Sequence, residues 1–310
     1  MSDAQWFLPH GSTRKNGCEV VVDDATPGWQ HTGLRVIALD SGQSWSIHGS
    51  GWEYVVVPLA GAASVTCTDS SGEEHEARLA GRSSVFAGPS DVAYAPAGAS
   101  LTVTGTAGGS RIALCAARVS GTGPTTGFRH VAADEVPVEL RGAGSCSREV
   151  RNFGVPQCLD ADSIIACEVV TPAGNWSSYP PHKHDQEREG VETELEEIYY
   201  FETQVAGAAA GAAVAGPTDP VGYQRVYGTV DRPIDVFAEV RTGDVVLVPH
   251  GWHGPSMAAP GYDLYYLNVM AGPGNQRAWL ICDDPSHGWV RQTWEGLAVD
   301  PRLPVGGAER

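Results

Sequence analysis

Short hydrophobic runs recur along the whole chain and are separated by Gly, Pro, Asp and Ser, with a spacing of about ten residues. The runs are rich in β-branched and aromatic residues, and one of them, SLTVTG, alternates apolar and polar positions as a half-buried strand does. No amphipathic helical pattern exceeds about three turns. The pattern therefore predicts an all-β protein, a sandwich or a barrel, with strands at 18–24, 33–42, 53–61, 62–69, 100–105, 110–119, 162–174, 197–202, 236–249 and 262–272.

The runs fall into two groups, one before about residue 120 and one after about residue 150, with the flexible segment SGTGPTTG (120–127) between them. Segments 81–103 and 240–256 share an outline of strand, Gly/Pro turn and strand. We therefore expect two copies of one β fold. The Ala/Gly-rich stretch at 206–220 is expected to be a loop insertion.

Composition narrows the class of protein. The 310 residues are 42% apolar, which suits one large domain or two of ordinary size. A formal net charge of −17 argues against nucleic-acid or anionic membrane partners, while leaving small anions possible. The sequence has no apolar stretch of about 20 residues and no secretory signal pattern. Seven cysteines without a CxxC pair indicate buried thiols and a reduced, cytoplasmic location.

Two histidines separated by one residue form the first chemical signal. His182 and His184 lie in SSYPPHKHD, where two prolines favour an extended chain. In an extended segment both imidazoles lie on one face and Lys183 on the other. Such a pair can chelate a metal, although an isolated pair is also compatible with the surface of an edge strand.

Further ligands follow in the same half of the chain. Glu197 opens the aromatic strand segment EIYYFE, and TGDVVLVPHGWHGP leads a buried strand into a turn that presents His250 and His253. Three histidines and one carboxylate from separate strands would form an N₃O metal site with room for a substrate. The combination favours a metal site over surface histidines.

These residues resemble a known family. The paired motifs His182-x-His184 and Gly243-x5-P-x-G-x-His253 are similar to those of the cupin superfamily. Within it, SSYPPHKHD, LEEIYYFE, YQRVYG, GDVVLVPHGWH and YDLYYLNVMAGP resemble the 5-deoxy-glucuronate isomerases of myo-inositol catabolism. Twelve residues separate His184 from Glu197, more than in the ordinary cupin motif but similar to this subfamily.

The resemblance implies a bicupin, two double-stranded β-helix (jelly-roll) barrels in one chain. We expect an N-terminal cupin domain without metal at 1–125, a connection at 126–149, a metal-binding cupin domain at 150–290 and a tail at 291–310.

The metal ligands implied by the resemblance are His182, His184, Glu197 and His253. Glu197 is preferred to Glu196 because it directly precedes the aromatic strand. The ion is a divalent metal, with Zn favoured and Mn, Fe or Ni open.

The implied activity is an aldose–ketose isomerisation of 5-deoxy-D-glucuronate to 5-dehydro-2-deoxy-D-gluconate, so the expected partner is a small sugar acid. An Arg would pair with the substrate carboxylate, and Arg225 is our first choice, with Arg151 behind it. The alternative is that both are strand-surface residues paired with acids. Tyr227 is a further candidate for the substrate pocket.

The general base is left open among His250, Asp263 and a metal-bound water. Alternation along YDLYYLNVM places Asp263 and Tyr265 on one face, so both are candidate catalytic groups. The alternative for the tyrosines of this segment is packing inside a barrel.

Three other functions are compatible with the same residues. A related uronate isomerase, an Fe(II) dioxygenase and a non-enzymatic sugar-binding protein would each fit a His-rich β-barrel site. A homodimer is plausible because cupin barrels have edge strands.

Overall fold

The computed structural model describes residues 3–48, 51–119, 126–207, 216–274 and 276–306. Most of the predicted connection at 120–127 and of the Ala/Gly insertion at 206–216 lies outside the described residues. The proposed loop character of both segments therefore stays a prediction.

The described residues form three antiparallel sheets. A nine-stranded sheet contains β2 Cys18–Val22, β3 Thr32–Leu39, β4 Ser44–Ile47, β5 Trp52–Thr68, β6 Glu74–Arg82, β7 Val92–Ala95, β8 Ser100–Gly105, β9 Ser110–Arg118 and β10 Arg129–Val131. A seven-stranded sheet contains β1 Phe7–Leu8, β11 Val138–Arg141, β12 Arg148–Gly154, β13 Ile165–Thr171, β16 Glu196–Val205, β19 Val245–Val248 and β21 Tyr262–Ala271. A six-stranded sheet contains β14 Trp176–Ser177, β15 His182–Lys183, β17 Gly222–Tyr227, β18 Asp235–Val240, β20 Trp252–Ala258 and β22 Cys282–Asp283.

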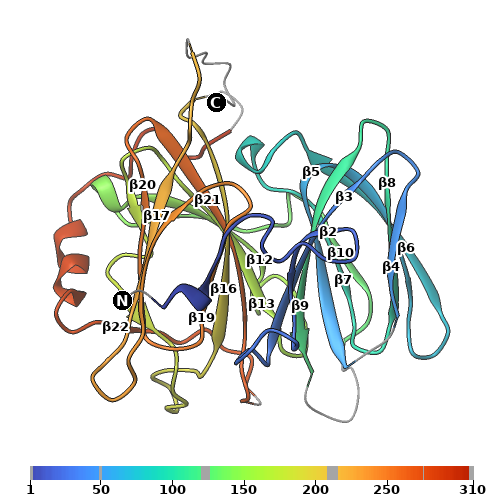
Figure 1. Cartoon of the computed structure of the whole chain (residues 1–310), viewed down its shortest axis with the longest axis horizontal. Coiled ribbons are helices and arrows are strands. Elements are labelled where there is room, and N and C mark those ends of the chain that lie inside the picture. Colours follow the sequence, from blue (N-terminus) through green and yellow to red (C-terminus); the bar gives the residue numbers. More distant parts are fainter. Residues whose placement is uncertain (1–2, 49–50, 120–125, 208–215, 275, 307–310) are drawn as a thin grey trace.

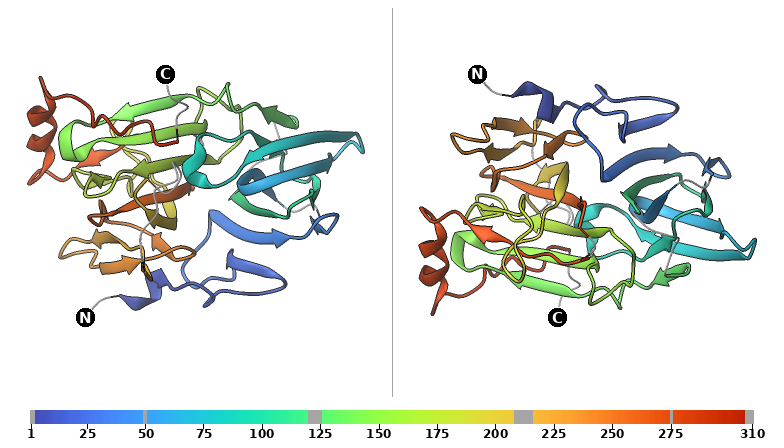
Figure 2. Two further views of the ribbon diagram at one scale, coloured as in Figure 1. Left: turned by 90° about the horizontal axis from the view of Figure 1, so that it is seen from above. Right: turned by 90° about the horizontal axis from the view of Figure 1, so that it is seen from below.

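Helical structure in the described residues is limited to short 3₁₀ segments, which include η1 Ala4–Trp6, η2 Val85–Ala87, η3 Gly144–Cys146 and η5 Gly288–Trp294. The predicted all-β class is confirmed. The nine-stranded sheet folds over on itself as one lobe, coloured blue to teal in Figure 1, and the other two sheets form the second lobe. The views from above and below show the two lobes side by side (Figure 2).

The two lobes repeat one strand order. In the N-terminal lobe the path runs β7-β5-β9-β3-β2, and in the C-terminal lobe it runs β19-β16-β21-β13-β12. Each strand of the first path therefore has a counterpart in the second, in the same chain order within each lobe. The prediction of two copies of one barrel fold is confirmed.

Three hydrophobic cores explain why many strands read as continuous apolar runs. One core fills each barrel, and a third lies between the two facing sheets. In β5, Tyr54 and Val56 point into the N-terminal barrel while Val55 and Val57 face the other lobe. A strand buried on both faces has no polar side to alternate with. The outer strand β18, by contrast, alternates exposed and buried residues.

The runs 53–61 and 62–69, predicted as two strands, form the single 17-residue strand β5. Gly61 lies at a register shift and has a φ of +76°. The strand bends there, so that its first part pairs with β9 and β7 and its second part pairs with β6 and β8. A bulge lets one strand pass from one face of the barrel to the other without a turn.

A strand near the N-terminus links the two lobes, and the predicted connection between the domains contains strands of both. β1, near the N-terminus, pairs with β19 of the C-terminal lobe. β10 pairs with β7, and β11 pairs with β12, so the predicted connection at 126–149 contributes a strand to each lobe. The described chain crosses between the lobes after β1 and again between β10 and β11, within the predicted connection, and the division at residues 125 and 150 stays a prediction.

Candidate metal centre and adjoining cavity

The two histidines of the HxH segment share one face of a short strand. His182 in β15 lies opposite His253 in β20, and the centroids of their rings are 4.5 Å apart. Lys183 turns the other way and donates from Nζ to Glu192 at 2.7 Å. This is the arrangement expected of an extended segment.

His184, Glu197 and His253 form a compact buried group. The Nε2 atoms of both histidines lie 3.1 Å from Oε2 of Glu197, which is at the start of β16. One ligand atom from each of the three residues lies within 4.8 Å of the others. All four predicted ligands, including His182, are less than one-tenth exposed. The structure therefore brings His184, Glu197 and His253 together in the C-terminal barrel, with the ring of His182 beside that of His253.

Backbone carbonyls orient the imidazoles. The Nδ1 atoms of His182, His184 and His253 face the carbonyl oxygens of residues 180, 195 and 251 at 3.3, 3.1 and 3.2 Å. An Nδ1–H bonded to a carbonyl leaves Nε2 as the lone-pair donor, which is the usual second shell of a metal-bound histidine. The Nε2 atom of His253 is buried and has no hydrogen bond despite its closeness to Glu197. The donor set and this orphaned nitrogen fit a divalent cation.

The surroundings shift the pKa values of two histidines in this cluster in opposite directions. Burial, together with His253 and His184, lowers the pKa of His182 well below 6.5. Burial opposes protonation of His184 as well, but Glu197 outweighs it and raises the pKa of that imidazole. Burial would raise the pKa of Glu197, and its contacts with His184 and His253 reverse the direction. Glu197 is therefore an ionised, buried carboxylate, which requires a cation beside it.

A cavity of about 420 Å³ opens beside the histidines. Its walls come from β11, β12, β13, β15, β16 and β21, from the segment before β15 and from the segment after β21. The lining residues are Arg141, Arg148, Val150, Val169, Ser178, His182, Glu197, Tyr199, Tyr266, Asn268, Trp279, Ile281, Asp283 and Arg291.

Two of the three arginines in the cavity wall are neutralised by acids. Arg141 donates to both carboxylate oxygens of Glu139 at 2.9 and 2.7 Å. Arg291 is paired in the same bidentate way with Asp283. These two side chains carry little net charge into the cavity.

Arg148 is different. Its side chain is only 5% exposed, its Nη1 donates to the carbonyl oxygen of Cys146, and no carboxylate among the described residues pairs with it. Its guanidinium lies 5.6 Å from the ring centroid of Trp294. Burial, with Arg141 and Arg291 nearby, lowers the pKa of Arg148 to about 10. The cavity therefore contains one buried cation without an anionic partner.

Hydroxyl groups line the wall near the cluster. Ser178, in the left-handed region at φ 47°, has its Oγ 3.2 Å from Oη of Tyr199 and 3.1 Å from Oη of Tyr266. Burial raises the pKa of both phenols, and Glu197 adds to the effect at Tyr199. Both tyrosines are therefore protonated at neutral pH and can donate hydrogen bonds into the cavity.

Two of the predicted substrate-binding residues lie outside the wall of this cavity. Arg225 is on the outer face of β17, where it pairs with Asp235. Tyr227, two residues further, donates its hydroxyl to Asp284 at 2.6 Å. Arg225 is thus the acid-paired strand-surface residue that the sequence left as its alternative.

Arg151 faces the other lobe. It is fully buried, donates to Glu149 at 2.7 Å and also bonds the carbonyl oxygen of Val85. Tyr265 lies on the same side of the sheet and donates to Glu168 at 2.7 Å. Both residues belong to the contact between the lobes and not to the wall of the cavity.

The remaining two catalytic candidates are also apart from the cluster. Asp263 accepts from the backbone N–H of Ala173 at 3.0 Å and from Gln204 at 3.1 Å. His250 is half-buried, and burial with Arg232 nearby lowers its pKa. Neither lines the cavity, and His253 is the histidine of this turn that lies with His184 and Glu197.

Comparison with known proteins identifies the family to which the chain belongs. The model of the KduI/IolB family matches residues 6–290. The chain belongs to the KduI/IolB family. It is 39% identical to the 5-deoxy-glucuronate isomerase of Geobacillus kaustophilus (strain HTA426), over 93% of this chain and 95% of that protein.

Solved structures agree with this family. The IolB-like protein of Salmonella typhimurium LT2 superposes with a TM-score of 0.78 at 34% identity, covering 92% of this chain and 98% of that one. The oxalate decarboxylase of Lactobacillus farciminis gives a TM-score of 0.63 at 12% identity, over 90% of this chain and 88% of that one. The second likeness supports the bicupin fold alone.

The cavity residues that the sequence did not single out share a face with those that it did. In this KduI/IolB chain, Tyr199 lies two residues after Glu197 on β16, and its partner in register on β21 is Asn268. Alternation from Glu197 would have found Tyr199, and alternation from Tyr266 finds Asn268. No sequence pattern identifies Arg148, because it differs from the other cavity arginines only in that no carboxylate among the described residues pairs with it.

The N-terminal lobe of this family member lacks the ligand types at the equivalent positions. The segments DVVLVPHGWH (244–253) and DVAYAPAGAS (91–100) align without a gap, so His253 corresponds to Ser100. Glu197 opposite Val248 corresponds to Tyr54 opposite Ala95. A serine and a tyrosine therefore occupy two of the places where the C-terminal lobe has ligands.

No helix in the described part of the chain is long and apolar enough to cross a membrane.

Proposed function

We propose that this chain is a 5-deoxy-glucuronate isomerase, a metal-dependent aldose–ketose isomerase that forms 5-dehydro-2-deoxy-D-gluconate. The observation that carries the proposal is the buried group of His184, Glu197 and His253, with His182 beside it, next to a cavity that contains a guanidinium without a carboxylate partner among the described residues. A sugar acid offers the two groups that such a cavity lacks, namely vicinal oxygens for a cation and a carboxylate for an arginine. The names of the relatives support the same activity.

The four cluster residues would hold a divalent ion, for which Zn is our first choice and Mn, Fe and Ni are alternatives. When bound, this ion would act as a Lewis acid that stabilises negative charge on the substrate oxygens during the isomerisation. The carbonyl groups at residues 180, 195 and 251 would keep the three imidazoles in the tautomer that donates through Nε2.

Arg148 is the proposed anchor of the substrate carboxylate, in place of Arg225 and Arg151. Its buried guanidinium has donors to spare and no carboxylate paired with it in the described part of the chain, whereas Arg225 and Arg151 are already paired. A planar guanidinium can bind a carboxylate with two hydrogen bonds, which also fixes the direction in which the sugar acid lies.

Asp283 is the proposed general base. It is the only carboxylate in the wall of the cavity, among the described residues, besides the cluster residue Glu197. The protonated hydroxyls of Tyr199 and Tyr266 would donate hydrogen bonds to substrate oxygens, because burial keeps their pKa values high. In this arrangement a carboxylate moves the proton between adjacent carbons while phenols orient the chain of the sugar.

The test is turnover of 5-deoxy-glucuronate by the purified protein before and after chelation. We expect chelation to abolish isomerisation and one divalent ion to restore it. His253→Ala should not recover with that ion, whereas His130→Ala, a change on β10 of the other lobe, should behave as wild type.

Other results would change the mechanism, the substrate or the reaction that we propose. Turnover that survives chelation contradicts the metal-dependent mechanism. Turnover of a related uronate alone would change the substrate, and oxygen consumption by an iron-loaded sample would indicate a dioxygenase. The absence of turnover with every uronate tested would contradict the proposal as a whole.

A further inference from the structure

A carboxylate of the metal-bearing strand is held by the other lobe. Glu196, next to Glu197 on β16, accepts hydrogen bonds from the backbone N–H groups of Gln30, His31 and Thr32 at 3.2, 2.7 and 2.7 Å. The hydroxyl of Thr32 donates to the same carboxylate at 3.0 Å. Glu196 is 8% exposed, so these four bonds form with little water around them. We call this contact the Glu196 clasp.

The opposite lobe contains a second clasp of the same design. Glu53 on β5 accepts from the backbone N–H groups of Asp162, Ser163 and Ile164 at 3.0, 2.7 and 2.6 Å. A side-chain hydroxyl, that of Tyr94, completes this contact at 2.6 Å. We call it the Glu53 clasp.

The two clasps are equivalent by strand register. Glu197 pairs with Val248 on β19, and Tyr54 pairs with Ala95 on β7, where β7 and β19 are counterparts in the two lobes. The residues just before them, Glu196 and Glu53, are therefore counterparts as well. The clasps differ in the residue after the carboxylate, which is the cluster residue Glu197 in one lobe and Tyr54 in the other.

The position of Glu196 bears on two members of the cluster. Because neighbouring residues on a strand point to opposite faces, Glu196 reaches toward the other lobe while Glu197 points into the barrel. On its other side, Leu195 donates its N–H to the carbonyl oxygen of His184 at 2.8 Å and accepts from Nδ1 of that imidazole at 3.1 Å. Fixing Glu196 thus fixes the backbone on which both Glu197 and His184 depend.

We propose that Glu196 is a positioning residue, through which residues 30–32 of the N-terminal lobe hold Glu197 and His184 in place for the metal. This inference rests on the proposed metal site. It gives the N-terminal lobe a part in metal binding without a ligand of its own. Outer contacts that orient metal ligands contribute about 10- to 100-fold to metal affinity in other proteins.

The test compares Glu196→Gln with Glu53→Gln in the full chain. Both changes replace a buried carboxylate that accepts four hydrogen bonds, of which all four at Glu196 and three at Glu53 come from the opposite lobe, so both should lower thermal stability. Zn²⁺ affinity, measured by competition with a chromophoric chelator, should fall about 10-fold or more in Glu196→Gln relative to Glu53→Gln. A second pair, Thr32→Val and Tyr94→Phe, removes only the hydroxyl of each clasp and should show the same asymmetry at smaller size.

Equal Zn²⁺ affinity in Glu196→Gln and Glu53→Gln would overturn the positioning role while leaving the metal site intact. A wild-type protein that binds no divalent ion would instead overturn the metal site itself. If a Gln variant does not fold, the pair Thr32→Val and Tyr94→Phe decides, and equal affinity in that pair counts against the proposal.

Discussion

The guanidinium of Arg148 is buried in the cavity wall without a carboxylate partner among the described residues. Removing a charge from water is unfavourable unless an opposite charge replaces the lost hydration. Burial accordingly lowers the pKa of this arginine to about 10, although the side chain still remains charged at neutral pH. A bound carboxylate would supply the missing partner, and without it we expect this buried charge to lower the free energy of unfolding relative to an apolar side chain.

Arg148→Met should therefore affect binding more than folding. We expect KM for 5-deoxy-glucuronate to rise and kcat/KM to fall about 100-fold, since a charged hydrogen-bonded contact contributes about 3 kcal/mol. The free energy of unfolding should stay the same or increase, because the unpaired charge is gone. Steady-state kinetics and urea unfolding measure the two quantities.

Two further variants separate binding from proton transfer. Asp283→Asn should lower kcat with a smaller effect on KM, while Arg225→Met should leave both unchanged because Arg225 lies outside the cavity wall. A rise in KM for Arg225→Met without one for Arg148→Met would return the anchor to the residue favoured by the sequence.

Spacing in the sequence can locate the histidines of the metal cluster, but it cannot decide which residues line the cavity, and the reason is physical. His182 and His184 are separated by one residue in an extended segment, so spacing alone places them on one face. The choice between Tyr265 and Tyr266 needs the additional knowledge that both faces of β21 are buried, one in the barrel and one against the other lobe. Alternation identifies two faces but not which of them surrounds the cavity.

Among the elements, β5 depends most on a single residue. Gly61 allows the strand to bend between its two sets of partners, with a φ of +76°. A Cβ at this position would lie 2.3 Å from the carbonyl oxygen of Gly109. The Pro and Gly of this segment predict a break between two strands near residue 61. One long strand forms instead, because the chain makes a bulge there and not a turn.

Gly61→Ala should consequently destabilise the protein by roughly 3 kcal/mol, as a positive φ and a backbone overlap add together. Gly42→Ala is the matched control, because Gly42 has a φ of +77° and a methyl group added there would meet no atom within 4 Å. The control should lose only about 1 kcal/mol. Chemical denaturation of both variants measures the difference, and equal losses would mean that the bend tolerates a side chain.

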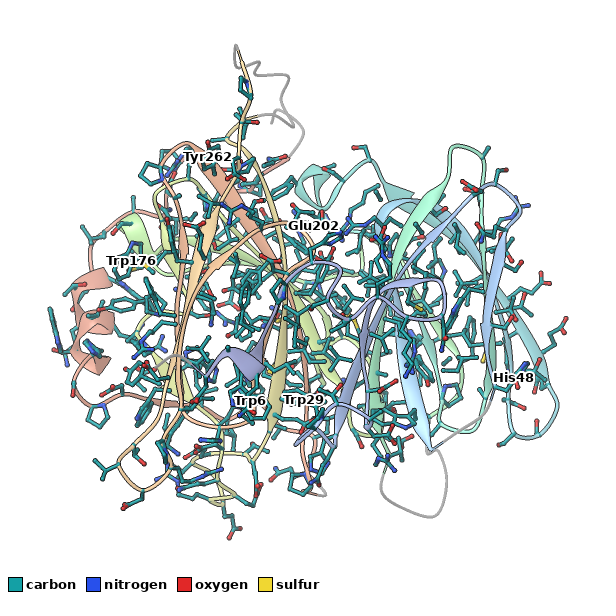
Figure 3. The ribbon with its side chains drawn as sticks, viewed as in Figure 1. Trp6, Trp29, His48, Trp176, Glu202 and Tyr262 are labelled. Carbon is teal, nitrogen blue, oxygen red and sulfur yellow. The ribbon has the colours of Figure 1, made fainter. Side chains whose placement is uncertain are left out.

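The two lobes act as one molecule because charged groups and an apolar layer join them. Glu202 of the C-terminal lobe, which pairs with Arg111 of the N-terminal lobe, lies at the seam in Figure 3. A second contact is deeper, where Arg82 donates to Glu168 and both side chains are at most 3% exposed. Tyr265 completes the shell of Glu168, which explains why this tyrosine faces away from the cavity.

This buried pair should make stability depend on pH. Burial alone would raise the pKa of Glu168, but Arg82 and Arg151 outweigh it and hold the pKa below the ordinary 4.5. The unfolded chain therefore takes up the proton first as the pH falls. The contribution of the pair is complete above the ordinary value and is lost progressively below it, as the pH approaches the lower pKa of the folded state.

The double variant Arg82→Met/Glu168→Gln isolates this effect. At pH 7, Arg82→Met alone should lose about 3–5 kcal/mol, because Glu168 would remain buried with less compensation, and adding Glu168→Gln should restore part of the loss. Between about pH 4.5 and pH 3, the free energy of unfolding of the wild type should fall more steeply than that of the double variant. One proton corresponds to about 1.4 kcal/mol per pH unit, which sets the upper limit of the difference. Parallel pH profiles would show that the pKa of Glu168 is the same in the folded and unfolded states, and would contradict this prediction.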